Sequence, residues 1–476
     1  MSTKGLQALR AASPVDGLER VQLGDTRRNR RALRVAEKIA YAPSASLPAI
    51  ALSDTELVPI YRLFNEADVT PAALLAPHME ETARRAALFD EVLVIHDTTE
   101  VAYTGRRNGL GPLSDRSAQG YLAHVSLVVA AGSAPLPLGV LALEQLVRPP
   151  ATNEKRKRRS LLDPANEFAR WHRGITTTRE RLAGHPGVVH LADREGDCFE
   201  LFAVMLDEQD RFVIRQKVDR RLAGSDAGSK LLEKLADFPC LSERTIDIEA
   251  RRQHKAPPAK KRKHPPREAR TAHLEIHAGQ VEIRRPQGLK SSCPEKLALN
   301  VVHVVELQPP PGQEPVEWVL FTTEPIDTRE QVDRIVDWYC RRWIIEEFFK
   351  ALKTGCAVER RDFVEGHALK NVFALCVPIA WHMLVLRALA RYDPGARATK
   401  LFPLLMLEVL FLGSRHLPPS QRPARNPTVS EALTAIAALG GHLRRNGEPG
   451  WLTIARGYQH VLQLARGYSL AKPRAP

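Results

Sequence analysis

The stretch YCRRWIIEEFFKALK, residues 339–353, says more about the fold of this chain than any other. An α-helix turns by about 100° per residue, so it gathers several polar side chains of this stretch into one stripe. The stripe consists of Tyr339, Arg342, Glu346, Lys350 and Lys353. The apolar side chains lie about a quarter-turn away from it. The pattern predicts one helix that packs on a core and presents a carboxylate among cations at the rim.

The chain is long and basic. Its 476 residues suffice for a large core and roughly two to four domains. Lysine and arginine number 69 against 55 aspartates and glutamates, which gives a net charge of +14 and a pI of about 9.6. Such a charge favours a polyanionic partner, either nucleic acid or an anionic membrane surface.

Membrane insertion and disulfide bonding are not expected. The N-terminal segment has no apolar signal core. The most apolar run, residues 372–386, is interrupted by Pro378 and His382 and is too short to cross a bilayer. The six cysteines are scattered without a CxxC or Cys/His pair, so their spacing predicts neither a zinc site nor disulfide bonds. We expect a cytoplasmic protein with no membrane partner.

A basic amphipathic helix is predicted near the N-terminus, in LGDTRRNRRALRVAEKIA (residues 23–40), with Asp25 as its N-cap. Arg27, Arg31 and Arg34 lie within about 60° of one another on one face. This face is either an ordinary solvated surface or a contact for DNA phosphates. Arginines in a first turn oppose the helix dipole, which adds weight to a phosphate partner.

Strand and helix patterns alternate through the middle of the chain. Apolar strands are predicted at 91–97, 121–130, 134–144, 187–193 and 211–217, and helices at 167–183 and from 199. This order favours the α/β class, with a mixed sheet flanked by helices. A β-rich insertion with four strand candidates follows at about 218–327, and helices return from 366 onward. The basic runs at 155–159 and 251–270 are either disordered loops or nucleic-acid contacts.

Carboxylates follow two of the predicted strands. Asp97 and Asp193 each stand at the carboxyl end of an apolar strand, where a sheet holds an acid at its edge. Two such anions repel each other unless a cation bridges them. With Glu346 they form a set of hard oxygen ligands that suits Mg²⁺ or Mn²⁺ rather than zinc. A single strand-end aspartate is more often a turn or cap residue. The neighbouring acids that could replace these ligands are Glu195, Asp197 and Glu347.

At these motifs the chain resembles the DDE transposases of bacterial cut-and-paste insertion sequences, in the subgroup with a Y-R-E-K signature. Residues 339–353 reproduce that signature without a gap, and DREGD at 193–197 is similar to the family's D-R-E-A-D. Asp97 is followed by two threonines, as in the family, although His96 stands where an acid is expected. The resemblance extends from about residue 20 to about residue 365, and includes SDRSAQGYLAHVSL at 114–127.

The resemblance implies a catalytic triad and a DNA clamp. Asp97, Asp193 and Glu346 are its expected catalytic and metal-binding residues, with two Mg²⁺ ions for which Mn²⁺ can substitute. The expected phosphate contacts are Tyr339, Arg342, Lys353 and, beside them, Lys350. Trp318 is expected to stack on a flipped base, whereas its sequence pattern alone is typical of a core residue.

The resemblance also implies a domain plan. It comprises a helical DNA-end-binding domain (1–72), an RNase H-like catalytic domain with a β-rich insertion (73–392) and a helical C-terminal domain (393–476). The expected partners are double-stranded DNA, both transposon ends and target DNA, and a second copy in a homodimer. Two alternatives stay open, a structure-selective nuclease on the same core and a domesticated DNA-binding protein without catalysis.

Overall fold

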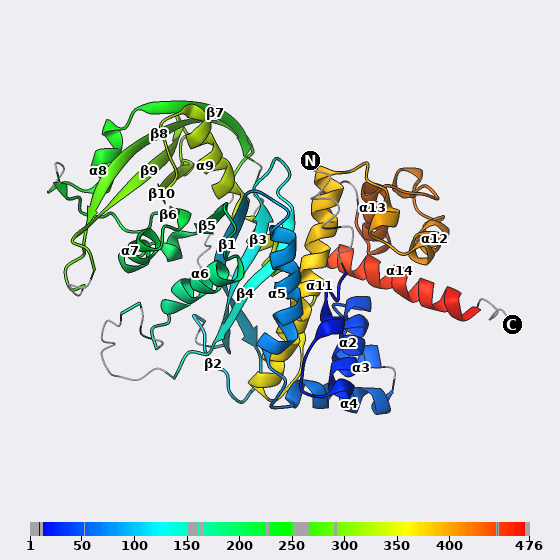
Figure 1. Cartoon of the computed structure of the whole chain (residues 1–476). Coiled ribbons are helices and arrows are strands. Elements are labelled where there is room, and N and C mark those ends of the chain that lie inside the picture. The colour runs from blue at the N-terminus through cyan, green and yellow to red at the C-terminus, as the bar shows by residue number, and fades with distance from the viewer. Residues whose placement is uncertain are drawn as a thin grey trace. The chain divides into compact units, whose positions relative to one another are not determined.

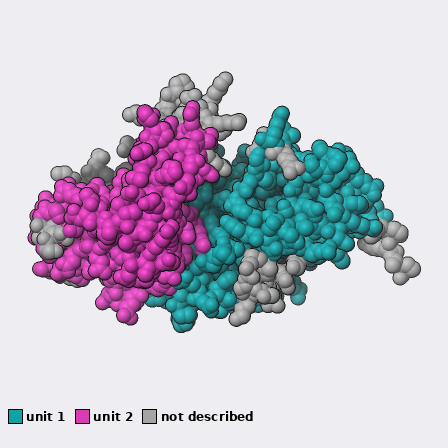
Figure 2. Space-filling view, turned by 90° about the horizontal axis from the view of Figure 1, so that it is seen from above, with its two compact units in different colours: residues 1–188, 343–476 teal, residues 189–342 magenta. Residues whose placement is uncertain are grey.

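The structure is a computed structural model of the whole chain. It describes residues 9, 13–51, 53–115, 117–150, 160–161, 163, 165–224, 228–248, 250, 267–289, 293–443, 445 and 447–471. The basic run at 155–159, most of the one at 251–270 and one position of the 114–127 motif lie outside the described residues. The chain forms two compact units, the first of residues 1–188 and 343–476 and the second of residues 189–342 (Figure 2).

The first unit begins with helices. They are η1 (Leu18–Arg20), α2 (Thr26–Tyr41), α3 (Leu47–Ala51), α4 (Asp54–Asn65) and α5 (Pro71–Ala86). The predicted cap of α2 is confirmed, because the Asp25 carboxylate accepts hydrogen bonds from the backbone N–H groups of Arg27 and Arg28. Val35 and Ile39 lie on the buried face of α2, and arginines lie on the other face.

An antiparallel sheet forms the core of the first unit. Its strands are β1 (Val92–Tyr103), β2 (Gly111–Pro112), β3 (Gln119–Ala130) and β4 (Pro137–Leu146). β3 pairs with β1 over the whole length of both strands, and also with β2 and β4. The prediction that the first strand ends at Asp97 is wrong. Pairing with β3 and the β-branched residues after Asp97 carry β1 on to Tyr103, so Asp97 lies in mid-strand.

Helices cover both faces of this sheet (Figure 1). On β3, His124 and Tyr121 are three residues apart and therefore point to opposite faces. Gly174 of α6 (Ala169–Arg181) lies against His124, and Phe373 of α11 (Gly366–Tyr392) contacts Tyr121 with ring centroids 6.0 Å apart. The face that carries His124 is named the α6 face below, and the face that carries Tyr121 the α11 face.

Helix α11 corrects one expectation. With 27 residues it is long and apolar enough to span a membrane, whereas the sequence pattern indicated a segment too short to do so. In the structure, 89% of its most apolar 18-residue window is buried. It packs on α5 and β4 of its own unit, and its Trp381 Nε1 donates to the Pro137 carbonyl oxygen at 2.9 Å. Helix α11 is therefore a core helix of the first unit.

The rest of the first unit is helical. Its elements are α10 (Ile344–Lys350), η5 (Ala351–Gly355), η6 (Val358–Arg360), η7 (Ala398–Lys400), α12 (Leu404–Gly413), η8 (Pro419–Gln421), α13 (Val429–Leu439) and α14 (Trp451–Ala471). Helices α12, α13 and α14 pack together around a small apolar core that includes Leu410, Ile436 and Val461. The helices predicted for the C-terminal region are therefore present.

The second unit is built on a mixed sheet. Its elements are β5 (Val188–Ala192), η2 (Arg194–Gly196), α7 (Phe199–Asp207), β6 (Arg211–Arg215), α8 (Leu231–Lys234), η4 (Leu235–Asp237), β7 (Cys240–Ile248), β8 (Arg270–Arg284), β9 (Lys296–Leu307), β10 (Glu317–Thr322) and α9 (Arg329–Arg341). The strand order is β5-β6-β10-β9-β8-β7. Only the β5–β6 pair is parallel among these. Helix α9 lies on one face, where Arg244 of β7 pairs with Asp333 and Asp337. The predicted α/β class, with mixed pairing and flanking helices, is confirmed.

The signature stretch is not the single helix that its spacing predicted. Helix α9 ends at Arg341 and α10 starts at Ile344, and α10 passes into the π-helical turn η5. At the break, Arg342 N–H bonds to the Tyr339 carbonyl and Glu346 N–H to the Trp343 carbonyl, so the bonding changes locally to i→i−3. A uniform turn of about 100° per residue therefore does not hold across this stretch.

Candidate functional site

Asp97 lies in the first unit, on the α11 face. Its register partner is Val125, which is an even number of residues from Tyr121 on β3. The side chain is almost buried, with 8% exposed, and the Asp97 Oδ1 accepts the Thr98 N–H at 2.7 Å. His96 points to the opposite face, where its Nδ1 lies 2.9 Å from Ser126 Oγ. The histidine at the position where the family has an acid thus serves the core and does not join Asp97.

A buried polar network holds the strand from the α6 face. Thr98 Oγ1 lies 2.9 Å from His124 Nδ1 and accepts a hydrogen bond from Arg170 Nε, also at 2.9 Å. Burial keeps the pKa of His124 well below its usual range, and the charge of Arg170 lowers it further. Arg170 is a residue that sequence reasoning missed, because nothing in its local pattern sets it apart from other helix arginines.

Glu346 lies on α10, also in the first unit. This helix packs against both β1 and α11, which lies on the face that carries Asp97. Ile345 and Phe348 form the fully buried face of α10, as predicted, and Glu346 is half-buried. The adjacent Glu347 pairs with Arg387 of α11 at 3.6 Å. Glu347, one of the acids that could have replaced a predicted metal ligand, is therefore held in an ion pair.

Lys353 and Lys350 follow Glu346 on the first unit. The Lys353 Nζ donates to the Glu100 carbonyl oxygen of β1 and pairs with Glu359 at 3.4 Å. An ammonium has three N–H donors, so these two partners leave donor capacity for one more acceptor. Lys350 is exposed, and its Nζ lies 5.1 Å from the centroid of the Trp343 ring.

Asp193 lies in the second unit, directly after β5 as predicted. Its carboxylate caps η2, where Oδ1 accepts the Glu195 N–H at 2.8 Å. Asp197, four residues further on, is almost buried and forms an ion pair with Arg220. Its Oδ2 also accepts two backbone N–H groups, from Lys217 at 2.6 Å and Val218 at 2.8 Å. Because Asp197 is fully engaged in holding this loop, it does not suit a metal-ligand role.

Tyr339 of α9 and Trp318 of β10 lie together in the second unit, with ring centroids 5.4 Å apart. Tyr339 is 5% exposed, so the expectation that it stands at an exposed rim is wrong. Trp318 is only partly buried, which differs from a core residue, and the Arg215 guanidinium lies 5.9 Å from its ring centroid. Burial raises the pKa of the Tyr339 hydroxyl, Arg342 and Arg215 oppose that shift, and Asp193 adds to it.

Positive charge gathers around that aromatic pair. Burial lowers the pKa of Arg215, whose guanidinium bonds to the Tyr339 hydroxyl, and the charges of Arg194 and Arg342 lower it further. Arg215 lies on β6 and donates to the Glu317 carbonyl oxygen at 2.9 Å. Sequence reasoning missed Arg215 and Arg194, since only the strand pairing between β6 and β10 brings Arg215 beside Trp318.

A basic groove runs between α2 and α4 in the first unit. Its basic lining residues are Arg27, Arg30, Arg31, Arg34 and Lys38. Lys38 pairs with Glu56 across the groove at 2.8 Å. Among the described residues, the four arginine side chains have neither an ion pair nor a hydrogen bond with another side chain. Arg30 was not among the phosphate contacts predicted from the sequence, although its spacing of three from Arg27 places both residues on one face of the helix.

Comparison with known families gives two matches. Residues 15–69, which contain the basic groove, match the transposase DNA-binding family. Residues 169–379, which contain Asp193, Trp318 and the 339–353 stretch, match the transposase DDE domain family. Asp97 lies outside both matched stretches. The chain belongs to the DDE transposases: it is a transposase that binds DNA and cleaves nucleic acid.

Proposed function

We propose that this transposase is a cut-and-paste enzyme of the Y-R-E-K subgroup with an RNase H-like core, in which Asp97, Asp193 and Glu346 are the catalytic carboxylates. The observation that carries the proposal is the placement of α10 in the first unit. It sets Glu346 on a helix that packs on β1 and on α11, the helix that covers the face to which Asp97 points. Asp193 follows β5 at the start of the family's D-R-E motif.

These three carboxylates fit a hard divalent cation, because each offers oxygen donors. The nearby acids Asp197 and Glu347 are held by Arg220 and Arg387, which favours the proposed set over those two. Two Mg²⁺ ions, or Mn²⁺ in their place, supply activation of a water or 3′-hydroxyl and stabilisation of the leaving oxygen in an in-line phosphoryl displacement.

The basic residues of the signature hold the DNA backbone in this proposal. Arg342 and the third N–H of Lys353 contact phosphates, and Lys350 adds an exposed charge beside them. Phosphate contacts position a duplex without reading its sequence. Because Tyr339 is buried, its role is to orient Arg215 and Trp318, and a base stacks on the exposed part of the Trp318 ring.

The N-terminal groove binds the inverted-repeat ends of the element, with Arg27, Arg31 and Arg34 on phosphates. A homodimer pairs two ends, and the C-terminal helices of residues 393–476 form part of its interface. Cleaved 3′ ends are then joined to target DNA. The enzyme acts in the bacterial cytoplasm, associated with the nucleoid when bound to DNA.

A cleavage assay tests the proposal. Purified protein with Mg²⁺ is incubated with a labelled duplex that carries the element's end, and strand nicks and gel shifts are measured together. Asp97→Ala is expected to abolish cleavage and retain the shift. Glu347→Ala is the matched control, since its carboxylate pairs with Arg387, and it retains cleavage. Retained cleavage by Asp97→Ala would show that another acid performs the role.

The same assay separates the alternatives. Equal cutting of unrelated branched duplexes would favour a structure-selective nuclease. A shift without any cutting by the unaltered protein would favour a domesticated DNA-binding protein. Among the three hypotheses, only the transposase predicts that the cleaved 3′ end is joined to a second, unlabelled duplex.

A further inference from the structure

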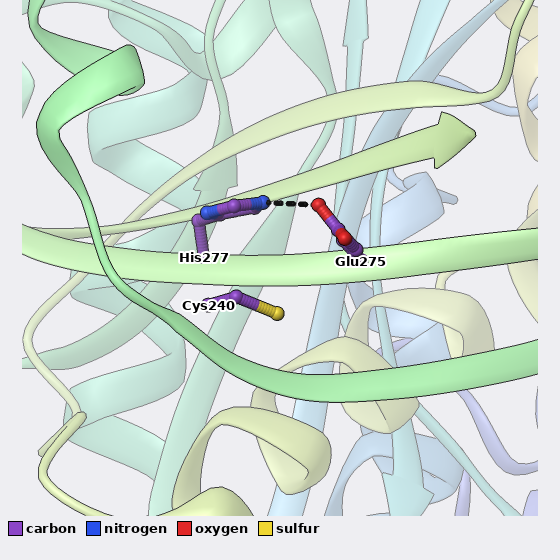
Figure 3. Close-up of side chains that lie close together, drawn as sticks. All are labelled: Cys240, Glu275 and His277. Carbon is purple, nitrogen blue, oxygen red and sulfur yellow. Dashed lines mark hydrogen bonds and ion pairs between the residues drawn. The ribbon is translucent and has the colours of Figure 1, made fainter. Parts of the chain in front are cut away.

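Three side chains with metal-binding atoms lie together in the second unit, and none of them is among the acids discussed above. They are Cys240 at the start of β7 and Glu275 and His277 on β8 (Figure 3). One ligand atom from each, the Sγ, a carboxylate oxygen and a ring nitrogen, lies within 4.8 Å of the other two. The cysteine is exposed and the other two are partly buried, so an ion can reach all three.

The strand geometry converges these groups. Glu275 and His277 are two residues apart on β8 and therefore lie on the same face of the sheet. Cys240 is the register partner of His277 on β7, and the pairing is irregular between Cys240 and Ser242. A β-bulge of this kind re-aims a side chain. Here the irregularity stands at the residue whose thiol joins the cluster.

The hydrogen bonds of His277 define which nitrogen is available. Its Nδ1 lies 2.9 Å from the Phe238 carbonyl oxygen, which can only accept, so Nδ1 carries a proton and donates. The carbonyl is held in place because the Phe238 ring packs over Gly279, where an added Cβ would lie 2.3 Å from the ring. A backbone carbonyl on one imidazole nitrogen is the usual outer support of a metal-binding histidine.

The other nitrogen then faces a carboxylate. His277 Nε2 lies 3.0 Å from Glu275 Oε2. With Nδ1 already donating, this contact is favourable when Nε2 also carries a proton or when a cation lies between the two atoms. An ion pair between protonated His277 and Glu275 would not require a third side chain. The Cys240 thiol beside them completes a ligand set of one sulfur, one nitrogen and one oxygen, which favours the cation. Such a mixed set is typical of Zn²⁺ and unsuited to Mg²⁺.

We propose that Cys240, Glu275 and His277 bind one Zn²⁺ ion, with water in the fourth position. The ion joins the start of β7 to β8, and β7 is the edge strand in the sheet of the second unit. Bound zinc therefore stabilises the strands that the family resemblance predicted as an insertion. The site shares no residue with the carboxylates proposed for catalysis, and it takes a different class of metal.

Cobalt spectroscopy tests this site in the full-length, reduced protein. Co²⁺ is added in the presence of excess Mg²⁺, which occupies sites that have only oxygen ligands. A thiolate-to-cobalt charge-transfer band with one ion per chain is expected, and Zn²⁺ should remove the band by displacement. Cys240→Ser should lose the band, and Cys340→Ser, which alters another exposed cysteine of the same unit, should keep it.

The remaining ligands have their own outcomes. His277→Gln and Glu275→Gln should each weaken Co²⁺ binding by at least about tenfold, since even outer-shell changes cost roughly 10–100-fold in metal affinity. Zn²⁺ should raise the thermal unfolding midpoint of the unaltered protein and leave that of His277→Gln unchanged. Absence of the band in the unaltered protein, or its survival in Cys240→Ser, would overturn the proposal and leave an ordinary His277–Glu275 ion pair. Neither result bears on Asp97 or on DNA cleavage.

Discussion

The basic groove between α2 and α4 in the first unit gives a quantitative prediction for DNA binding. Arg31 and Arg34 line the groove without a side-chain partner among the described residues, so each is available to a phosphate. Replacing both by alanine removes two phosphate contacts. Each contact contributes about 0.9 to the slope of log K against log salt concentration, so the double variant should have a slope shallower by about 1.8.

The slope translates into affinities. Between 50 and 200 mM salt, one contact changes the binding constant by about 3.5-fold, and two contacts by about 12-fold. The double alanine variant should therefore bind more weakly at low salt and lose less affinity over that range. Fluorescence anisotropy of a labelled end duplex, titrated with full-length protein at several salt concentrations, measures both quantities. Lysine at both positions keeps the charge and should restore most of the slope.

Arg28 supplies the matched control on the same helix. It donates to the Leu23 carbonyl oxygen at 2.7 Å and lies within ion-pair distance of Asp68 and Glu66, at 3.4 and 3.6 Å. Arg28→Ala should lower the stability of the N-terminal helices and leave the salt slope of the folded protein unchanged. If Arg28→Ala and the Arg31/Arg34 double variant change the slope equally, the groove is not the phosphate contact.

Three further variants test other parts of the structure. Asp197→Asn breaks a buried pair with Arg220 and should cost about 3–5 kcal/mol of unfolding free energy in urea titrations. Glu195→Ala in the same loop should cost far less. Trp318→Ala should weaken binding of a duplex with an unpaired end base by roughly 1–3 kcal/mol, and Trp318→Phe should retain most of it. The third is Asp16→Asn. Burial alone would raise the pKa of Asp16, but its hydrogen bonds and ion pairs with His78 and Arg85 outweigh burial and lower the pKa to about 2, against an ordinary 3.8. Because this folded-state pKa is depressed, the Asp16 carboxylate stabilises the fold above pH 4, and this contribution of about 2 kcal/mol is lost as the pH falls towards 2. The variant should flatten unfolding free energy against pH in that window, and an unchanged pH dependence would contradict the assignment.

Local signals in the sequence predicted much of this fold. The strands of the first sheet and the cap of α2 follow from residue periodicity and from a side chain that bonds to its own neighbours. Asp193 and its position after β5 were predictable for the same reason. The ends of helices and strands were less predictable. The length of β1 past Asp97 is set by its pairing with β3, and no pattern inside β1 marks where that pairing stops.

Groups assembled over long sequence distances could not be predicted. The spacing rules assume a uniform helix through residues 339–353, whereas the hydrogen bonding changes at Arg342 and Trp343, where the chain passes from the second unit to the first. Arg215 reaches Trp318 only through strand pairing. Cys240 and His277 lie 37 residues apart in the sequence, farther than in the short zinc-binding motifs, and meet because β7 and β8 are adjacent. These contacts depend on the pairing register of strands that are distant in the sequence, and local residue patterns do not reveal that register.

The division of the first unit into two chain segments has a consequence during synthesis. Helix α11, which covers the α11 face of the sheet, is synthesised after the 154 residues 189–342 of the second unit. At about 5–20 residues per second, a ribosome needs roughly 8–30 s to make those residues. For that time the apolar face made of β1, β3 and β4 has emerged without its covering helix, while the second unit is continuous and can fold at once. Slow translation or chaperone shortage should therefore harm the first unit before the second.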